Sequence, residues 1–276
     1  MRDKAIIISA IAPIFEQPMP KASLADEVLH GMIVEVLRHC GEFYYIKTAY
    51  GYRGYARASD LKNYKDDPFV SVYEKIPTHR VRACFADVLD GRNVRAAVVA
   101  TLPRGAEVLA SKNLEGSING YVPVTLADGK TYYMRREALE LPIAEQDEET
   151  LRSKLVNTAK KYLGTQYRWG GKTGMGIDCS GLVFMAYWIN GVTIWRDAVQ
   201  KKGYPVTKIG FDMVKPGDLV YFPKHVAMLI ENGKIIHSCH RNNGVRIESL
   251  DPAESGFRQD LYENILHAGT VFESVL

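Results

Sequence analysis

The chain runs Tyr167-Arg168-Trp169-Gly170-Gly171 and then, four residues later, Gly176-Ile177-Asp178-Cys179-Ser180-Gly181, and this stretch decides the fold of the second half. Directly after it, apolar residues recur at helical spacing: Leu182, Val183, Met185, Ala186 and Ile189. The pattern predicts a buried helix that begins after a glycine-rich loop and carries Cys179 in its first turn. The unpaired N–H groups and the positive dipole end of a helix start favour a thiolate. We therefore predict a nucleophilic Cys179; the alternative is a structural cysteine.

A base for this cysteine is expected between His225 and His240. Two apolar strands in this segment flank Asn232-Gly233, which is a strong hairpin signal. The turn decides which histidines share a face of the sheet. A two-residue turn that pairs Glu231 with Lys234 sets His225 opposite His240.

A three-residue loop with its glycine in the left-handed position changes this register. Ile230 then pairs with Lys234, His237 lies opposite Ala227, and His237 shares a face with His225. That arrangement supplies a base and a second imidazole to orient it, as in a nucleophile–base–orienter triad. The sequence leaves both registers open, and we expect the second; in the first, the orienting role would pass to His240.

Six short motifs follow one another through the second half: Tyr-x-Trp-Gly-Gly at 167–171, Asp-Cys-Ser-Gly at 178–181, Arg196-Asp197, Pro216-Gly217-Asp218-Leu219, His225-Val226-Ala227 and Ile236-His237. With them, residues 150–276 resemble the catalytic domain of the NlpC-type bacterial cell-wall cysteine peptidases. The resemblance implies an α+β papain-like fold that cleaves peptidoglycan stem peptides. It also implies that Cys179 is the nucleophile, His225 the general base and His237 the orienting residue. Tyr167 would join the Cys179 backbone N–H in the oxyanion hole, or would only pack beside the loop.

The first half contains an internal repeat with a period of about 75 residues. Glu35-Val36-Leu37 matches Glu107-Val108-Leu109, and Ala49, Gly51, Tyr55, Arg57 and Leu61 recur in step as Ala127, Gly129, Tyr133, Arg135 and Leu139. Short strands with closely spaced turn signals predict two small β-barrels. The units resemble bacterial SH3-like domains, although a tyrosine replaces the usual tryptophan. Such domains bind cell-wall peptides or only frame a neighbouring site.

Length and charge agree with a multidomain chain. Over 276 residues we predict a first SH3-like domain at 1–66, a second at 67–143, and the peptidase domain at 144–276, with the acidic linker 145–149 at its start. The net charge of +3 is too small and too dispersed to argue for nucleic acid. A monomer is expected.

The four cysteines, Cys40, Cys84, Cys179 and Cys239, lack the paired spacing of a zinc site or a disulfide framework. We expect no metal and no other cofactor. A catalytic Cys179 would leave three cysteines, which fits a reducing compartment. No apolar run reaches about 18 residues, so no membrane span is expected, and the start is interpreted as a strand and not as a signal peptide. We expect a cytoplasmic protein; the alternative is an exported one whose signal is absent from this chain.

Modules of the SH3-like kind combined with an Arg-Asp pair resemble the γ-D-glutamyl-L-diamino-acid endopeptidases, also called dipeptidyl-peptidase VI. This likeness implies murein stem peptides with a free N-terminal L-Ala as substrates and L-Ala-γ-D-Glu as the product. It implies that Asp197, 18 residues after Cys179, and a tyrosine of the first module hold the terminal ammonium. Tyr52 is the expected tyrosine, because residues shared by both repeats are expected to be structural. The second repeat has Lys130 in place of Tyr52, whereas Tyr55 recurs there as Tyr133.

The residues that flank the nucleophile complete the predicted substrate site. Asp178 and Ser180 are expected to contact the γ-linked glutamate. The family often has a serine after the aspartate, but Ala198 stands here, so one polar contact is missing.

Other functions stay open at this point. A general cell-wall hydrolase would use the same catalytic residues without an ammonium pocket. Intact Cys179, His225 and His237 argue against an inactive wall-binding protein. The SH3-like modules and the lack of an amphipathic membrane segment argue against an acyltransferase or amidase that acts on lipids.

Overall fold

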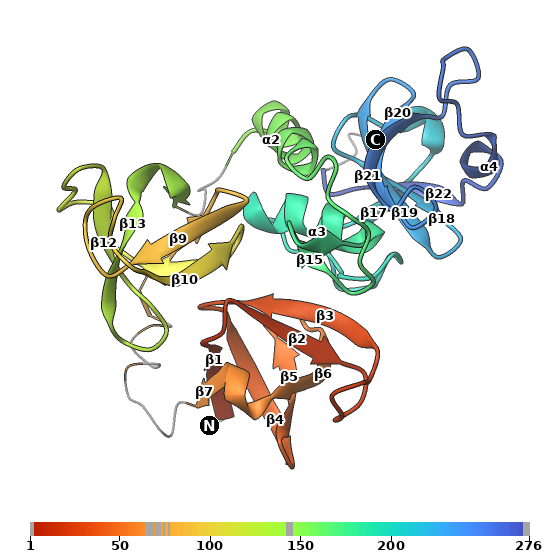
Figure 1. Cartoon of the computed structure of the whole chain (residues 1–276). Helices are drawn as coiled ribbons and strands as arrows, with labels where there is room; N and C mark the ends of the chain where they lie inside the picture. The colour runs from red at the N-terminus through yellow and green to blue at the C-terminus, as the bar shows by residue number, and fades with distance from the viewer. Residues whose placement is uncertain are drawn as a thin grey trace. The chain divides into compact units, whose positions relative to one another are not determined.

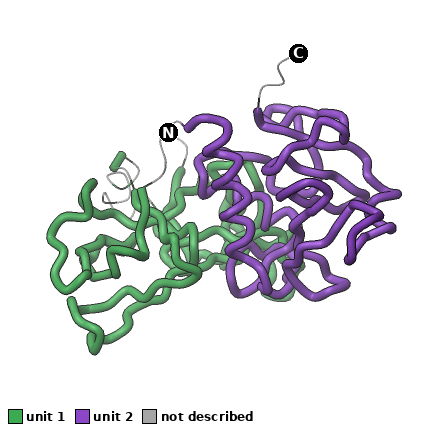
Figure 2. Tube along the Cα trace, turned by 90° about the horizontal axis from the view of Figure 1, so that it is seen from above, with its two compact units in different colours: residues 1–142 green, residues 143–276 purple. Residues whose placement is uncertain are grey.

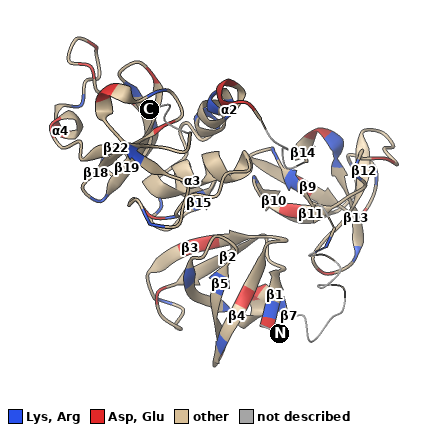
Figure 3. Cartoon of the chain, turned by 180° about the vertical axis from the view of Figure 1, so that it is seen from behind, with Lys and Arg blue, Asp and Glu red and all other residues tan. Residues whose placement is uncertain are grey.

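The computed structural model describes residues 3–63, 69, 73, 75, 76, 78–141 and 146–272. The chain divides into two compact units, Met1–Pro142 and Ile143–Leu276 (Figure 2). The expected domain boundaries at 66/67 and 143/144 lie outside the described residues. Both signs of charge are spread through both units (Figure 3). In the part of the chain that the structure describes, every helix is too short or too polar for a membrane span.

The first unit contains two antiparallel sheets of seven strands each (Figure 1). The first sheet has the order β3-β2-β6-β5-β4-β1-β7. Its strands are β1 (Asp3–Ile7), β2 (Ile11–Phe15), β3 (Leu24–Leu29), β4 (Ile33–Cys40), β5 (Phe43–Thr48), β6 (Arg53–Arg57) and β7 (Leu61–Asn63). A single 3-10 turn, η1 (Ala58–Asp60), precedes β7.

The second sheet repeats this plan, with the order β10-β9-β13-β12-β11-β8-β14. Its strands are β8 (Thr78–Val81), β9 (Phe85–Leu89), β10 (Val98–Pro103), β11 (Glu107–Leu109), β12 (Tyr121–Thr125), β13 (Thr131–Arg135) and β14 (Leu139–Glu140). The 3-10 turn η2 (Arg136–Ala138) stands where η1 stands in the first sheet. The predicted internal repeat is therefore confirmed in the order of the strands.

Neither sheet is a closed barrel, so that part of the prediction was wrong. Among the described residues, β3 and β7 end the first sheet, and β10 and β14 end the second. Alternating strands and turn signals predict a sheet, but closure depends on whether the edge strands pair, and no local signal encodes that. The three-residue β7 pairs with β1 and ends there.

The two sheets of the first unit meet at a buried contact. Ile6, Tyr73, Leu109 and Ala127 form its apolar cluster. At its edge, the Ala127 N–H donates to Nε2 of His30 at 3.2 Å. Nδ1 of the same ring lies 2.9 Å from the Ile8 carbonyl oxygen. One neutral imidazole thus joins backbone groups of both sheets.

The second unit packs helices against a six-stranded antiparallel sheet of order β17-β22-β18-β19-β20-β21. The sheet strands are β17 (Thr207–Ile209), β18 (Leu219–Phe222), β19 (His225–Glu231), β20 (Lys234–Cys239), β21 (Gly244–Ser249) and β22 (His267–Thr270). The other elements are α2 (Glu148–Lys160), β15 (Lys172–Thr173), β16 (Gly176–Ile177), α3 (Cys179–Ile189), η3 (Phe211–Met213) and α4 (Gln259–Tyr262).

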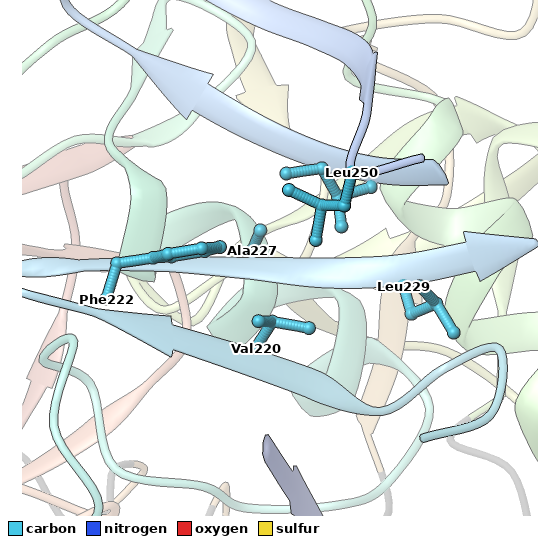
Figure 4. Close-up of a cluster of buried hydrophobic side chains, with 6 residues drawn as sticks. Val220, Phe222, Ala227, Leu229 and Leu250 are labelled. Atoms are coloured by element: carbon cyan, nitrogen blue, oxygen red, sulfur yellow. The ribbon is translucent and has the colours of Figure 1, made fainter. Parts of the chain in front are cut away.

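Apolar side chains from β18, β19 and β20, with one from the residue after β21, fill the core of this unit. The cluster consists of Val220, Phe222, Ala227, Leu229, Ile235 and Leu250 (Figure 4). Helix α3 contacts β19 and β20, and all but one of its side chains are buried. This burial explains the nearly continuous apolar sequence of α3.

The Pro-Gly-Asp motif joins α2 to the sheet. Asp218 is buried and accepts hydrogen bonds from Arg152 at 3.0 Å and from Thr270 at 2.6 Å. The Tyr187 hydroxyl donates to the Gly217 carbonyl oxygen. The motif therefore fixes the start of β18, where Leu219 pairs with Met228 of β19; His225 pairs with Phe222 at the other end of β18.

Candidate active site

Helix α3 begins at Cys179, which therefore lies in the first turn as predicted, and Asp178 is its N-cap. The Asp178 carboxylate accepts from the Gly181 N–H at 2.6 Å and from the Gly170 N–H at 2.8 Å. One carboxylate thereby joins the glycine-rich loop to the first turn of the helix. The cysteine side chain above this turn is 7% exposed.

Glycines allow the loop and the helix to approach this closely. A Cβ atom on Gly181 would lie 2.3 Å from the Gly171 carbonyl oxygen, and one on Gly171 would lie 2.4 Å from the Gly176 carbonyl oxygen. Both distances are far below van der Waals contact, and the opposing atoms belong to the backbone. Gly171 and Gly181 therefore both allow the backbone to pack closely at the start of α3.

A buried arginine donates hydrogen bonds to this loop, a role that the sequence did not predict. Arg196 is 1% exposed and donates to Asp178 at 3.0 Å, to the Ser180 hydroxyl at 2.8 Å and to the Gly171 carbonyl oxygen at 3.2 Å. Asp178 and Ser180 were expected to contact substrate. The structure shows both side chains engaged with Arg196, and their substrate contacts stay a prediction.

The hairpin brings His225 and His237 together. Met228 pairs with Ile236, and this register places the next residues, Ala227 and His237, opposite each other. Nε2 of His225 lies 2.7 Å from Nδ1 of His237. The prediction that the two histidines share a face is confirmed, and the alternative that placed His240 beside His225 was wrong.

The predicted turn was wrong in one detail. Glu231 pairs with Lys234 around a two-residue Asn232-Gly233 turn, and the register shifts between Leu229 and Glu231. The extra residue is Ile230, which forms a bulge. A two-residue turn with a bulge produces the same upstream register as the expected three-residue loop, because each adds one residue to β19.

Two contacts join the hairpin to the nucleophile. The backbone N–H groups of Val226 and Ser180 lie near enough to the Cys179 sulfur to lower the pKa of its thiol, against the larger opposing effect of burial. The Ser238 hydroxyl donates to the Ile177 carbonyl oxygen at 2.6 Å. The start of β19, where His225 stands, therefore lies beside the sulfur.

Burial sets the protonation of the cysteine–histidine pair. It raises the pKa of the Cys179 thiol to about 12, with a further contribution from the Asp178 charge. It also lowers the pKa of His225 to about 3, assisted by His237. Both shifts favour a neutral thiol and a neutral imidazole in the resting pair. Burial therefore opposes the thiolate that the helix start was expected to favour.

Tyr167 lies within the electrostatic reach of the sulfur. Burial, followed by the charge that Cys179 can carry, raises the pKa of its phenol to about 12. Its ring packs edge-on against His240, with 6.1 Å between the centroids. The hydroxyl therefore stays protonated and able to donate a hydrogen bond at neutral pH. Its place in an oxyanion hole stays a prediction.

Sequence reasoning missed a carboxylate behind the two histidines. Glu248 Oε2 lies 2.5 Å from Nε2 of His237. Asn242 donates to Oε1 of Glu248 at 2.7 Å, and Arg258 donates to Oε2. The signal that could have found Glu248 is its diagonal position across from His237, since His237 pairs with Arg246 on β21.

The two residues expected to hold an ammonium are described within separate units. Tyr52 lies in the β5–β6 turn, where its carbonyl oxygen accepts from the Thr48 N–H at 2.9 Å. Asp197 is half-buried in the loop after Arg196. Their predicted proximity stays a prediction.

The second unit, with a cysteine at a helix start and a histidine pair on the adjoining sheet, has the α+β architecture of a papain-like domain. Residues 164–263 match the model of the NlpC/P60 family. Dipeptidyl-peptidase 6 of Lysinibacillus sphaericus is 36% identical over 271 residues, which are 97% of this chain and 99% of that protein. The chain therefore belongs to the NlpC/P60 family.

Two further similarities refine this picture. A gamma-D-glutamyl-L-lysine dipeptidyl-peptidase of Bacillus subtilis (strain 168) is 31% identical over 155 residues, 52% of this chain and 49% of that protein. The crystal structure of an NlpC/P60 family protein from Bacillus cereus ATCC 10987 has a TM-score of 0.80 at 20% identity and covers 96% of this chain and 98% of its own. The likeness in fold thus extends over both units.

Proposed function

We propose that this chain is a cysteine endopeptidase that hydrolyses the bond between γ-D-Glu and the L-diamino acid of murein stem peptides. Its substrates carry a free N-terminal L-Ala, and L-Ala-γ-D-Glu is released. The observation that carries the proposal is the 2.7 Å contact between His225 of β19 and His237 of β20, with the start of β19 beside the Cys179 sulfur. Family membership and the names of the two dipeptidyl-peptidases support it.

The reaction begins from the neutral pair. His225 takes the thiol proton as the Cys179 sulfur attacks the γ-carbonyl carbon of D-Glu, and a C–S bond forms. The C–N bond then breaks, and the imidazolium gives its proton to the amine of the departing diamino acid. Water, deprotonated by His225, next attacks the thioester, and the dipeptide leaves with a free γ-carboxylate while the thiol regains its proton.

Two groups of this chain would bind the oxyanion of the tetrahedral intermediates. In the proposal, the Cys179 backbone N–H and the Tyr167 hydroxyl donate to it. The raised pKa of Tyr167 supports this assignment, because the hydroxyl keeps its proton across the neutral range. Arg196 supports the same geometry indirectly by holding the loop on which Tyr167 stands.

Substrate selection is assigned to the remaining predicted residues. Asp197 and Tyr52 would hold the terminal ammonium, and Asp178 and Ser180 would line the site of the γ-linked glutamate. A carboxylate that faces the amine disfavours an acylated terminus, because acylation leaves the carboxylate charge unpaired. The two repeats of the first unit would be SH3-like modules that frame this site, with domains at 1–66, 67–143 and 144–276.

The test uses L-Ala-γ-D-Glu-L-Lys, its diaminopimelate analogue and the same peptides with an N-acetylated alanine. We expect L-Ala-γ-D-Glu and the free diamino acid as the products by mass spectrometry. The free peptide should be favoured at least about thirtyfold, because a lost charge-assisted contact costs roughly 2 to 5 kcal/mol. Equal rates on both forms would indicate a general cell-wall hydrolase, and no cleavage of either would indicate a wall-binding protein.

A further inference from the structure

The hydrogen bonds behind the catalytic cysteine continue past the second histidine. His225 contacts His237 at 2.7 Å, and the far nitrogen of His237 contacts Glu248 at 2.5 Å. Arg258 and Asn242 hold the carboxylate from its other sides. His237 is fully buried, and the side chains of Glu248 and Arg258 are each 13% exposed. The chain of contacts therefore ends in a carboxylate with three fixed partners.

An ionised carboxylate at the end of this chain determines where each proton lies. It only accepts hydrogen bonds, so Nε2 of His237 must carry a proton. In neutral His237, Nδ1 is then bare and accepts from Nε2–H of His225. The bare nitrogen of His225 is Nδ1, which can take the proton of Cys179. The opposite arrangement would place a proton on Nδ1 of His225 and block the base.

We propose that Glu248, held by Arg258 and Asn242, is a positioning residue that fixes the proton arrangement of both histidines and thereby makes Nδ1 of His225 the base for Cys179. This inference rests on the proposed function, because it assigns His225 as the base. It adds a fourth member to the nucleophile, base and orienter. Glu248 does not touch the reacting atoms and acts through His237.

The surroundings of Glu248 keep it charged. Burial opposes its ionisation, but the hydrogen bonds of His237 and Arg258 and the positive charge of Arg258 help to hold the pKa of the carboxyl below its usual range. Glu248 and Arg258 also line a surface groove of about 540 Å³, through which solvent reaches the pair. The charged or titratable groups around the carboxylate are His237, Arg246, Arg258, Asp260, Arg241 and Glu263.

The first test is Glu248→Gln. Its amide has nearly the same shape but can donate to His237 as well as accept, so the blocking arrangement becomes accessible. We expect kcat on L-Ala-γ-D-Glu-L-Lys to fall roughly 10- to 100-fold, the effect of losing an outer partner that orients a histidine, with KM within about twofold. The matched control is Glu263→Gln, which lines the same groove but bonds Gln259 instead; it should keep wild-type rates.

A second readout needs no peptide substrate. The rate at which iodoacetamide alkylates Cys179, followed by mass spectrometry of the peptide that contains it, should fall in Glu248→Gln and not in Glu263→Gln.

A third test uses the pH profile of Arg258→Gln. In this variant the pKa of the Glu248 carboxyl rises, so Glu248 protonates at higher pH. The acid limb of kcat/KM should then move up by roughly one pH unit. A residue that only stabilised the fold would not move this limb.

Nitrogen NMR of the wild-type protein covers the case in which the variants do not fold. It should show Nδ1 of His225 and Nδ1 of His237 without protons, and both Nε2 atoms protonated. A proton on Nδ1 of His225, or wild-type hydrolysis and alkylation in Glu248→Gln, would overturn the inference. If alkylation depends on Glu248 but no murein peptide is cut, the proposed function fails and the positioning role stands. If the peptide is cut equally by wild type and Glu248→Gln, only the positioning role fails.

Discussion

The Ser238 hydroxyl donates to the Ile177 carbonyl oxygen at 2.6 Å and so joins the strand that carries His237 to the loop that ends at Cys179. Both partners are fully buried. A side chain outside the six sequence motifs therefore helps to hold the sheet of the two histidines against the loop at the nucleophile. The contact also joins two parts of the chain that are 61 positions apart.

Ser238→Ala should weaken both the fold and catalysis. It leaves the buried Ile177 carbonyl oxygen without this donor, which costs about 1 to 3 kcal/mol. Urea unfolding measures the stability loss, and kcat on the tripeptide should fall with it. Ser153→Ala on the exposed face of α2 is the control and should change stability by less than about 0.5 kcal/mol. Unchanged stability in Ser238→Ala would show that the contact contributes nothing.

Gly181→Ala should disrupt the loop at the nucleophile. Its Cβ would meet the Gly171 carbonyl oxygen at 2.3 Å, and backbone cannot move aside as a flexible side chain does. We expect a loss of roughly 1 to 3 kcal/mol in the free energy of unfolding. In a helix, alanine is normally more stabilising than glycine. A loss of stability in Gly181→Ala would therefore indicate the clash. Gly91→Ala, whose nearest neighbours lie at 3.3 and 3.5 Å, should be close to neutral.

His225 should make the fold sensitive to acid. Its pKa is lowered from 6.5 to about 3 in the folded state, so between these values the unfolded chain binds more protons than the folded one. The contribution of His225 to the free energy of unfolding is fully present above pH 6.5 and is lost as the pH falls toward 3. At pH 5 the loss is roughly 2 kcal/mol. His225→Gln should show a correspondingly smaller difference between unfolding free energies at pH 7 and pH 5; an identical pH dependence would contradict the lowered pKa.

His30 should matter for the joint between the two sheets of the first unit. Its ring accepts from the Ala127 N–H and contacts the Ile8 carbonyl oxygen, and burial lowers its pKa. His30→Ala should speed hydrogen exchange at the Ala127 amide roughly 5- to 150-fold, because about 1 to 3 kcal/mol of local stabilisation is removed. The exposed His39→Ala should leave that exchange rate unchanged. Equal protection in both variants would show that the ring does not join the sheets.

The predictable parts of this molecule are those with a local periodic signal. Apolar spacing after Cys179 predicted α3 with this cysteine in its first turn, and Asn232-Gly233 predicted the hairpin, with His225 and His237 on one face in the expected register. The bulge at Ile230 was not predictable in detail, because a bulge and a longer loop leave the same upstream pattern. The repeat predicted two like units, but local signals could not decide whether their edge strands pair.

The missed parts depend on contacts between distant segments. Glu248 reaches His237 only through the register of β20 against β21, and Arg258 joins it from the start of α4. Arg196 lies 18 positions from Asp178 yet is buried against it. The depth of burial around Cys179 also escapes a single sequence, and this burial reversed the expected direction of the thiol pKa.

The most direct test of the account compares wild type with Cys179→Ala on L-Ala-γ-D-Glu-L-Lys. Product release is followed by mass spectrometry, and circular dichroism checks the fold of both proteins. We predict that wild type releases L-Ala-γ-D-Glu, that Cys179→Ala releases none while staying folded, and that the exposed-cysteine control Cys84→Ser keeps the wild-type rate. Turnover near the wild-type rate in folded Cys179→Ala would contradict the central claim that this cysteine is the nucleophile.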